Sequence, residues 1–222
     1  MWKDRQQAGE ALGSIIISQC QQNQFSFGIH GIKLDNPYVL AIPRGGVVVG
    51  YYIAKRLHCP LNVIISRKIR HPFNEEFAIG YVTEQNQPVL GYTPQMLHDI
   101  PTLQIDEAIT NAMKETQDRV LFYRKGEDLP DLSKYDVILV DDGIATFWTL
   151  QGTITYLNHN NKPKSITVAV PVVLSQKTYD IVKSKVDNLI CPHISDELSI
   201  GAVYNNFNQV SDEEVKKLLE EK

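Results

Sequence analysis

The sequence predicts an α/β fold in which a parallel sheet of about five strands is covered by helices on both faces. Short strands that are apolar throughout, such as 38–43, 61–66 and 135–140, alternate with segments of helical periodicity. Strands without polar alternation are typical of parallel sheets buried on both faces. The chain has 222 residues, enough for one substantial core, so we predict a single domain over 1–222.

The individual elements follow from the apolar pattern. Apolar residues at helical spacing, from Ala8 to Ile16, predict a helix over the first 20 residues. The expected strands are short and apolar and lie at 38–43, 61–66, 135–140, 165–172 and 187–191. The later helices are expected at 47–58, 103–125, 148–159, 175–185 and 211–221. Two shorter strands are expected around the turn 85–87, and residues 67–76 are expected to form a basic loop.

The composition argues against several classes of protein. A net charge of −4 argues against general nucleic-acid binding, which usually shows as a basic surface. No apolar run reaches the ~20 residues that span a bilayer, and the N-terminus is charged from its third residue, unlike a secretory signal. Cys20, Cys59 and Cys191 are far apart and form no CxxC pair. They are expected to be small buried hydrophobes in a reducing, cytoplasmic compartment.

In parallel sheets, ligands bind at the carboxyl ends of the strands, which directs attention to the loops after Pro43, Ser66 and Val140. Asp141 and Asp142 end an otherwise apolar strand in the stretch VILVDDGIATFWTL. Two adjacent carboxylates repel one another unless a cation or hydroxyl groups share the site. A ribose diol fits, since each carboxylate accepts a hydroxyl hydrogen bond, and a nearby Mg²⁺ would relieve the repulsion.

The residues after the acid pair form a small-residue turn that leads into a helix. Free amides and the helix dipole there favour a phosphate, and Thr146 and Thr149 add hydroxyl donors. A diol beside a phosphate describes a ribose 5-phosphate. The alternative is an ordinary strand–loop–helix turn capped by Asp or Thr.

The two other loops carry positive charge. Arg44, Gly45 and Gly46 combine a bidentate phosphate donor with backbone that a ligand can approach closely. The segment after Ser66 holds four basic residues, Arg67, Lys68, Arg70 and His71, suited to a polyanion such as pyrophosphate. A turn ahead of a helix and a solvated loop are the respective alternatives.

Together these loops resemble the type I phosphoribosyltransferases, and VILVDDGIAT resembles the start of that family's signature for phosphoribosyl pyrophosphate (PRPP). The chain is also similar to a bacterial and archaeal subgroup known as predicted phosphoribosyltransferases. The matching stretches cover nearly the whole chain, at 3–9, 43–50, 67–80, 168–172 and 204–215.

The resemblance implies Mg²⁺-dependent transfer of a 5-phosphoribosyl group from PRPP to a small nitrogenous base, with release of pyrophosphate. Asp141, Asp142, Arg44 and Lys68 are the implied catalytic residues. The acids would hold the ribose hydroxyls, and Mg²⁺ would arrive with PRPP. The phosphate loop comprises Gly143, Ala145, Thr146, Phe147, Trp148 and Thr149.

The remaining implied roles concern pyrophosphate and the acceptor base. Arg44, Gly45 and Gly46 would form the pyrophosphate loop, and Lys68 with Arg67 would neutralise the leaving group. A small hood from segments 1–25 and 191–210 would cover the base. Tyr204 and Phe207 would either stack on that base or belong to the core. Dimers are common among similar proteins, so a homodimer is among the expected assemblies, with no nucleic-acid or membrane partner.

The chain departs from the family at the phosphate loop, where Thr146-Phe147-Trp148-Thr149 replaces a typical Thr-Gly-Ala-Thr. If the glycine is needed for positive φ, the cost of a side chain is roughly 1–2 kcal/mol. If it is needed for space, losing two charge-assisted hydrogen bonds weakens binding by ~3–6 kcal/mol. Two hypotheses follow: a working transferase with a reshaped loop, or an impaired relative that binds a nucleotide, a polyphosphate or a protein partner.

Overall fold

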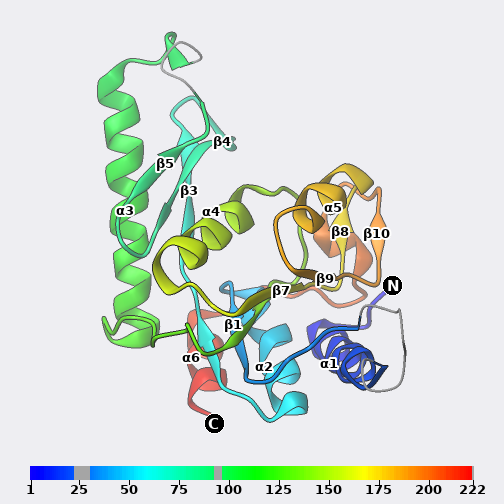
Figure 1. The fold of residues 1–222 in the computed structure, drawn as a ribbon. Helices are drawn as coiled ribbons and strands as arrows, with labels where there is room; N and C mark the ends of the chain where they lie inside the picture. The colour runs from blue at the N-terminus through cyan, green and yellow to red at the C-terminus, as the bar shows by residue number, and fades with distance from the viewer. Residues whose placement is uncertain (23–30, 93–96, 222) are drawn as a thin grey trace. The chain divides into compact units, whose positions relative to one another are not determined.

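The computed structural model describes residues 1–22, 31–92 and 97–221 (Figure 1). The side chains of residues 75, 76, 148 and 149 lie outside this description, as do residues 23–25 of the predicted hood. Contacts divide the chain into two compact units. The first comprises 1–63, 131–146 and 161–222, and the second comprises 64–130 and 147–160.

The first unit contains the predicted parallel sheet. Its five strands are parallel and lie in the order β2-β1-β6-β7-β9. Their bounds are Pro37–Ala41 for β1, Leu61–Val63 for β2, Asp136–Val140 for β6, Ser165–Ala169 for β7 and Asn188–Ile190 for β9. The chain adds β2 on one side of β1 and all later strands on the other. The strand order therefore reverses between β1 and β6, where ligands of such sheets usually bind.

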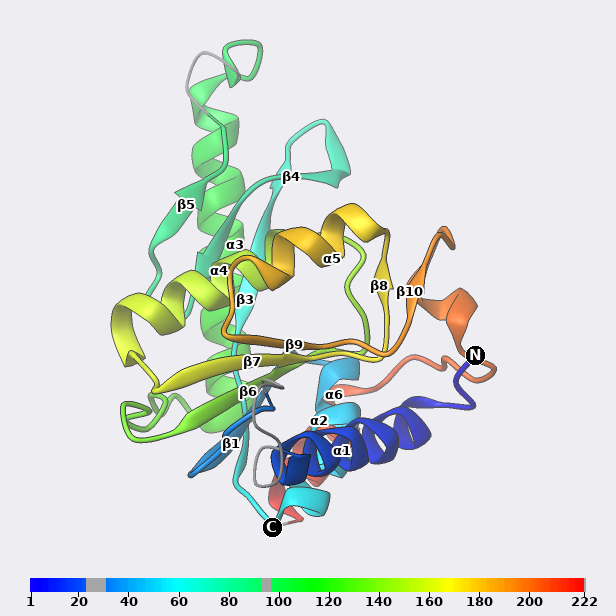
Figure 2. The same ribbon diagram turned by 45° about the vertical axis from the view of Figure 1, so that its right-hand side comes forward.

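Helices cover both faces of this sheet, as predicted (Figures 1 and 2). Helices α1 (Arg5–Gln22) and α2 (Gly45–Leu57) pack together on one face, and α5 (Gln176–Lys183) lies on the other. Helix α2 begins at Gly45, two residues before the predicted start. Both loop glycines are therefore inside its first turn.

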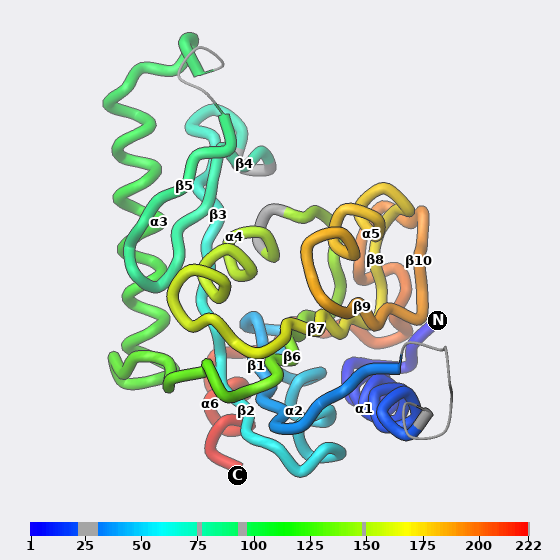
Figure 3. The backbone as a smooth tube through the Cα atoms, viewed as in Figure 1, coloured from blue at the N-terminus to red at the C-terminus, as the bar shows by residue number. Residues whose placement is uncertain are grey.

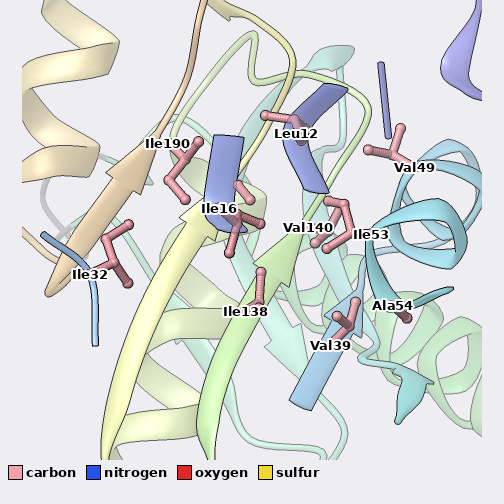
Figure 4. Close-up of a cluster of buried hydrophobic side chains, with 11 residues drawn as sticks. Leu12, Ile16, Ile32, Val39, Val49, Ile53, Ala54, Ile138, Val140 and Ile190 are labelled. Atoms are coloured by element: carbon pink, nitrogen blue, oxygen red, sulfur yellow. The ribbon is translucent and has the colours of Figure 1, made fainter. Parts of the chain in front are cut away.

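The core beneath α1 and α2 explains why these segments fold as they do. The strands contribute Val39, Ile138, Val140 and Ile190, and the helices contribute Leu12, Ile16, Val49 and Ile53, all seen in Figure 4. By strand alternation, Leu40 and Leu139 point to the opposite face and are equally buried. Burial on both faces accounts for strands without polar residues.

Short elements complete the first unit. Strands β8 (Val173–Leu174) and β10 (Ile194–Ser195) pair in parallel, and a 3₁₀ turn spans Ile200–Val203. Helix α6 (Asp212–Glu220) packs against α2. Its N-terminus is capped by Ser211, whose Oγ accepts a hydrogen bond from the Glu214 amide at 3.0 Å.

The three cysteines are free thiols and are half-buried. Cys20 and Cys59 pack against the core beneath α1 and α2. Burial raises the pKa of Cys59 to about 11, so this thiol stays protonated at neutral pH.

The second unit is an antiparallel sheet with a long helix beside it (Figure 3). Its strands are β3 (Ser66–His71), β4 (Asn74–Thr83) and β5 (Pro88–Leu90), in the order β3-β4-β5. Helix α3 (Thr102–Arg124) packs on β3 and β4 through a core that includes Ile69, Ile79 and Ala112. Helix α4 (Trp148–Tyr156) also belongs to this unit and continues into a π-helical turn at Leu157–Asn161.

The prediction of a basic loop at 67–76 is wrong. Residues Ser66–His71 form β3, which pairs with β4 so that Ile69 lies opposite Gly80. The predicted strand 61–66 ends at Val63, as β2. Backbone hydrogen bonding to β4 and burial of Ile69 in the core outweigh the charge of the segment.

Within the described residues, no helix is both long and apolar enough to cross a membrane.

Candidate functional site

The loops after β1 and β6 lie side by side at the point where the strand order reverses. The amide of Ile42 donates a hydrogen bond to the Val140 carbonyl at 2.9 Å. A Cβ on Gly46 would lie 2.8 Å from Asp141 Cα and 2.9 Å from the Val140 carbonyl oxygen. The two backbones approach so closely that only glycine fits at position 46. Two of the three predicted loops thus form one site in the first unit.

The first acid of the pair is held in a state that resists ionisation. Asp141 Oδ1 accepts a hydrogen bond from the Asp142 amide at 2.8 Å. Burial, and secondarily the neighbouring Asp142 carboxylate, raise the pKa of Asp141 well above its usual range, while Arg5 lowers it. Asp141 is therefore the carboxyl that a cation or hydroxyl donors would stabilise.

The second acid is ion-paired with a residue from the start of the chain. Arg5 Nε lies 2.7 Å from Asp142 Oδ2, and both side chains are largely buried, with 11% and 14% of their surface exposed. Arg5 Nη1 also donates to the Asn208 carbonyl at 2.8 Å. The guanidinium therefore joins the N-terminal segment, the acid pair and the segment after Tyr204.

Aromatic side chains complete this cluster. Arg5 Cζ lies 3.8 Å from the centroid of the Phe207 ring, and the Tyr204 and Phe207 rings are 4.9 Å apart. The buried Tyr204 hydroxyl donates to the Asp142 carbonyl oxygen at 2.6 Å. Tyr204 is therefore a core residue that supports the acid pair, while Phe207 is half-buried beside Arg5.

The two segments expected to form the hood are joined by backbone hydrogen bonds. Trp2 exchanges such bonds with Val203 and Asn205, and Lys3 accepts one from the Asn206 amide, all at 2.8–2.9 Å. Residues 2–3 and 203–206 are thus held together within the first unit.

The loop after Pro43 places its predicted residues against the acids. A Cβ on Gly45 would fall onto the Asp142 carboxylate, and it would lie 2.7 Å from Arg5 Nε. Arg44 is half-buried, and its Nη1 is 4.0 Å from Asp212 Oδ2, at the outer limit of an ion pair.

The predicted phosphate loop crosses from the first unit, at 143–146, into the second, at 147–149. Gly143 is packed tightly, since a Cβ there would lie 2.6 Å from Ile200 Cγ2. Ile144 exchanges backbone hydrogen bonds with Val172 and Leu174 at 2.9 and 2.8 Å. Ala145 and Thr146 are exposed.

The backbone at Phe147 bears directly on the departure from the family. Phe147 has φ −73° and ψ −15°, a right-handed conformation that any residue adopts. It is the N-cap of α4 and makes no side-chain cap hydrogen bond. Phe147 therefore does not incur the cost predicted for positive φ. What remains to decide is whether its half-buried ring occupies the space that a phosphate would need.

The third predicted segment lies in the second unit. Arg67 Nη2 pairs with Glu115 Oε2 of α3 at 3.0 Å, and Lys68 is exposed on β3. These two residues are on a strand of the antiparallel sheet rather than in a loop after a parallel strand.

Sequence reasoning missed the role of Arg5. Arg5 lies in the matching stretch at residues 3–9, for which the resemblance implies no chemistry. A lone arginine at the start of a helix gives no local sign of a carboxylate 137 residues away.

Comparison with known proteins identifies the family. Residues 16–203 match the family model described as "Phosphoribosyl transferase domain". A curated relative from Mycobacterium tuberculosis, "Putative phosphoribosyl transferase Rv0571c", is 32% identical over 188 residues. That match covers 82% of this chain and 41% of the relative, so the chain spans less than half the length of the curated protein.

A solved structure is similar over the whole chain. The crystal structure of TT1426 from Thermus thermophilus has a TM-score of 0.76 and 30% sequence identity. The similarity covers 99% of this chain and 97% of that one.

Proposed function

Because this chain belongs to the phosphoribosyl transferase family, we propose that it transfers the 5-phosphoribosyl group of PRPP to a nitrogenous base. The bond from the ribose C1 to the pyrophosphate oxygen breaks, a bond from C1 to the acceptor nitrogen forms, and pyrophosphate leaves. Positive charge develops on the sugar and negative charge on the leaving group.

The observation that carries this proposal is the acid pair at the reversal of strand order, next to Arg44 and Gly45. The Asp142 carboxylate, paired with Arg5 at 2.7 Å, would accept a hydrogen bond from a ribose hydroxyl. Asp141, whose pKa is raised by burial, would accept a hydrogen bond from the second hydroxyl in its ionised form, which such a donor stabilises. Together they would orient the ribose without attacking it.

Phosphate recognition is assigned to the flanking segments. The glycine-containing loop at 44–46 and the Arg44 guanidinium would bind pyrophosphate. Residues 143–149 would bind the 5-phosphate through backbone amides and threonine hydroxyls. For Lys68 and Arg67 we retain the hypothesis that they neutralise the leaving pyrophosphate.

The residues present fit a magnesium ion that arrives bound to PRPP. Among the described residues, no group of three or more His, Cys, Asp or Glu side chains could hold a metal. The half-buried Asp141 carboxyl, by contrast, would be stabilised in its ionised form by a nearby cation. When bound, Mg²⁺ would supply charge neutralisation for the pyrophosphate oxygens. Asp141 and Asp142 are the carboxylates proposed to face it.

An assay of pyrophosphate release tests this proposal. The chain would be incubated with PRPP, Mg²⁺ and a panel of purine and pyrimidine bases, and new nucleotides would be identified by mass spectrometry. We expect pyrophosphate release that depends on the added base. In Asp142→Asn the rate of release should fall by on the order of 10²-fold or more, as for loss of charge-assisted contacts. Release by Asp142→Asn at the wild-type rate would contradict the role of the acid pair.

The Phe147 ring favours one second candidate, a relative that binds a nucleotide, a polyphosphate or a protein partner without transferring ribose. Binding of PRPP with no turnover on any base would favour this candidate. For either function we propose a cytoplasmic setting, which suits three free thiols, and a homodimer, which analytical ultracentrifugation would test.

A further inference from the structure

The basic segment that sequence analysis singled out lines a cavity of its own. A cavity of about 450 Å³ lies between β3 and α3 in the second unit, within the ~300–1,000 Å³ range of small-molecule sites. Its charged lining residues are Lys68, Arg70, Lys114, Glu115 and Asp118, and His71 also lines it. Every lining residue belongs to the second unit. Lys68 already has a proposed role at the leaving pyrophosphate, so the inference below rests on Arg70 and Lys114, which have no role in the proposed phosphoribosyl transfer.

Positive charge exceeds negative charge at this cavity. Lys68, Arg70 and Lys114 are cationic, whereas Glu115 is already paired with Arg67 at 3.0 Å. Asp118 is the second lining carboxylate, so three cationic side chains and two carboxylates line the cavity. In a chain of net charge −4, such a local excess of cations is suited to an anion.

Arg67, the ion-pair partner of the lining residue Glu115, adds a further cation next to the cavity. Burial is the main cause that lowers the pKa of the Arg67 guanidinium, and the nearby Arg119 and Arg70 lower it further despite Glu115. Its Nε is buried and has no hydrogen-bond partner within the described part of the chain. An anion in the cavity would reduce this repulsion.

Two exposed aromatic rings contact His71, a residue that lines the cavity. The His71 ring lies 6.0 Å from the Phe73 ring and 5.8 Å from the Phe77 ring. Phe73 is 65% exposed and Phe77 is 42% exposed, unusually high for phenylalanine. His71 Nδ1 accepts a hydrogen bond from the Phe73 amide at 3.1 Å, which leaves Nε2 as the donor of the neutral ring.

We propose that this cavity binds a nucleotide. Arg70 and Lys114 hold the phosphate chain, and the base stacks on Phe73 or Phe77. Nucleotides can be recognised without base-specific hydrogen bonds by two components. These are cations that bind the phosphates and exposed aromatic rings on which the base stacks.

Calorimetry with three probes in EDTA tests the proposal: ATP, inorganic tripolyphosphate and adenosine. We expect ATP to bind more tightly than tripolyphosphate and adenosine to bind most weakly. Arg70→Ala combined with Lys114→Ala should weaken ATP and tripolyphosphate binding by on the order of 100-fold, as for two charge-assisted contacts. Phe73→Ala combined with Phe77→Ala should weaken ATP binding by about 10-fold and leave tripolyphosphate unchanged.

Two controls are needed. Arg44→Ala tests whether the ligand binds at the acid pair instead, and a double lysine variant tests whether loss of any two positive charges weakens binding. Lys177→Ala with Lys183→Ala removes the same charge from two exposed positions on α5 and should leave binding unchanged. All three double variants should keep the wild-type circular dichroism spectrum, because their side chains are exposed.

Four results would overturn the proposal. The first is wild-type binding of neither ATP nor tripolyphosphate, and the second is unchanged binding in Arg70→Ala/Lys114→Ala. The third is binding lost in Arg44→Ala but kept in Arg70→Ala/Lys114→Ala, which would place the ligand at the acid pair. Equal affinity for ATP and tripolyphosphate would overturn the assignment of a nucleotide.

Discussion

Arg5 Nε and Asp142 Oδ2 lie 2.7 Å apart in a largely buried ion pair that joins the start of the chain to the predicted ribose site. This contact gives the acid pair a permanent cation within the protein. It explains how two adjacent carboxyl groups are tolerated at the end of an apolar strand, because Arg5 lowers the pKa of Asp141 while burial and Asp142 raise it.

Replacement of Arg5 should therefore shift the pH dependence of PRPP binding. In Arg5→Gln the pKa of Asp141 rises further, so its ionised carboxylate forms only at higher pH. The acid limb of a plot of PRPP affinity against pH should move to higher pH, and Arg5→Lys should restore part of the shift. Titration calorimetry from weakly acidic to weakly basic pH would measure it. Lys3→Gln, which removes a nearby exposed cation, is the control, and an unshifted limb in Arg5→Gln would refute this role.

Gly46→Ala should disrupt the site. A Cβ at position 46 would lie 2.8 Å from Asp141 Cα and 2.9 Å from the Val140 carbonyl oxygen, which are both backbone atoms and cannot rotate away. We expect destabilisation by about 1–3 kcal/mol, as for overpacking in a core, together with loss of PRPP binding. Urea unfolding and calorimetry would measure these effects. Val48→Ala, two residues along α2, should keep PRPP affinity.

Tyr204→Phe should weaken the support of the acid pair while keeping the aromatic packing. The hydroxyl donates to the Asp142 carbonyl at 2.6 Å, and the ring packs 4.9 Å from Phe207. Loss of this bond leaves a partly buried acceptor unsatisfied, at a cost of about 1–3 kcal/mol. Chemical denaturation would record the loss. Tyr179→Phe, on the partly exposed face of α5, should have little effect.

The second unit has a buried ion pair whose disruption should depend on pH. Arg124 Nη2 lies 2.6 Å from Glu84 Oε2, with 5% of each side chain exposed. Arg124→Met should destabilise the protein by about 3–5 kcal/mol at neutral pH, because an unpaired carboxylate stays buried. Arg124→Met combined with Glu84→Gln removes both charges and is the matched control for loss of the pair without an unpaired buried charge.

The sign of the pH effect follows from Glu84. Its folded pKa is raised, chiefly by burial and against the lowering effect of Arg124, so removal of Arg124 raises it further. A raised carboxyl pKa gives stability that is present below the unfolded pKa and lost as pH rises through the folded pKa. The deficit of Arg124→Met should therefore shrink as pH falls, which urea unfolding at a series of pH values would measure. A deficit that grows at low pH would contradict this account.

The parallel sheet and the acid pair were predictable from sequence because their signals are local. Continuous apolar strands reflect burial on both faces, and Asp141 and Asp142 are conspicuous at the end of such a strand. The proximity of Gly46 and Asp141 was also predictable from sequence, because both residues follow strands of the same parallel sheet.

What was mispredicted depends on partners that lie outside the segment concerned. The segment at 67–71 resembles a loop because its basic residues obscure a strand whose inward side chain is Ile69. The segment forms strand β3 because it pairs with β4 and packs against α3. Neither contact can be inferred from the residues of the segment alone. The partnership of Arg5 with Asp142 was missed for the same reason.

Calorimetric titration with PRPP and Mg²⁺ tests the central claim, that the acid pair and its adjoining loops bind PRPP, most directly. We expect weak but measurable binding by the native chain, tighter binding by Phe147→Gly with Trp148→Ala, and none by Asp141→Asn with Asp142→Asn. Absence of binding by both the native chain and the Phe147→Gly/Trp148→Ala variant would contradict the claim.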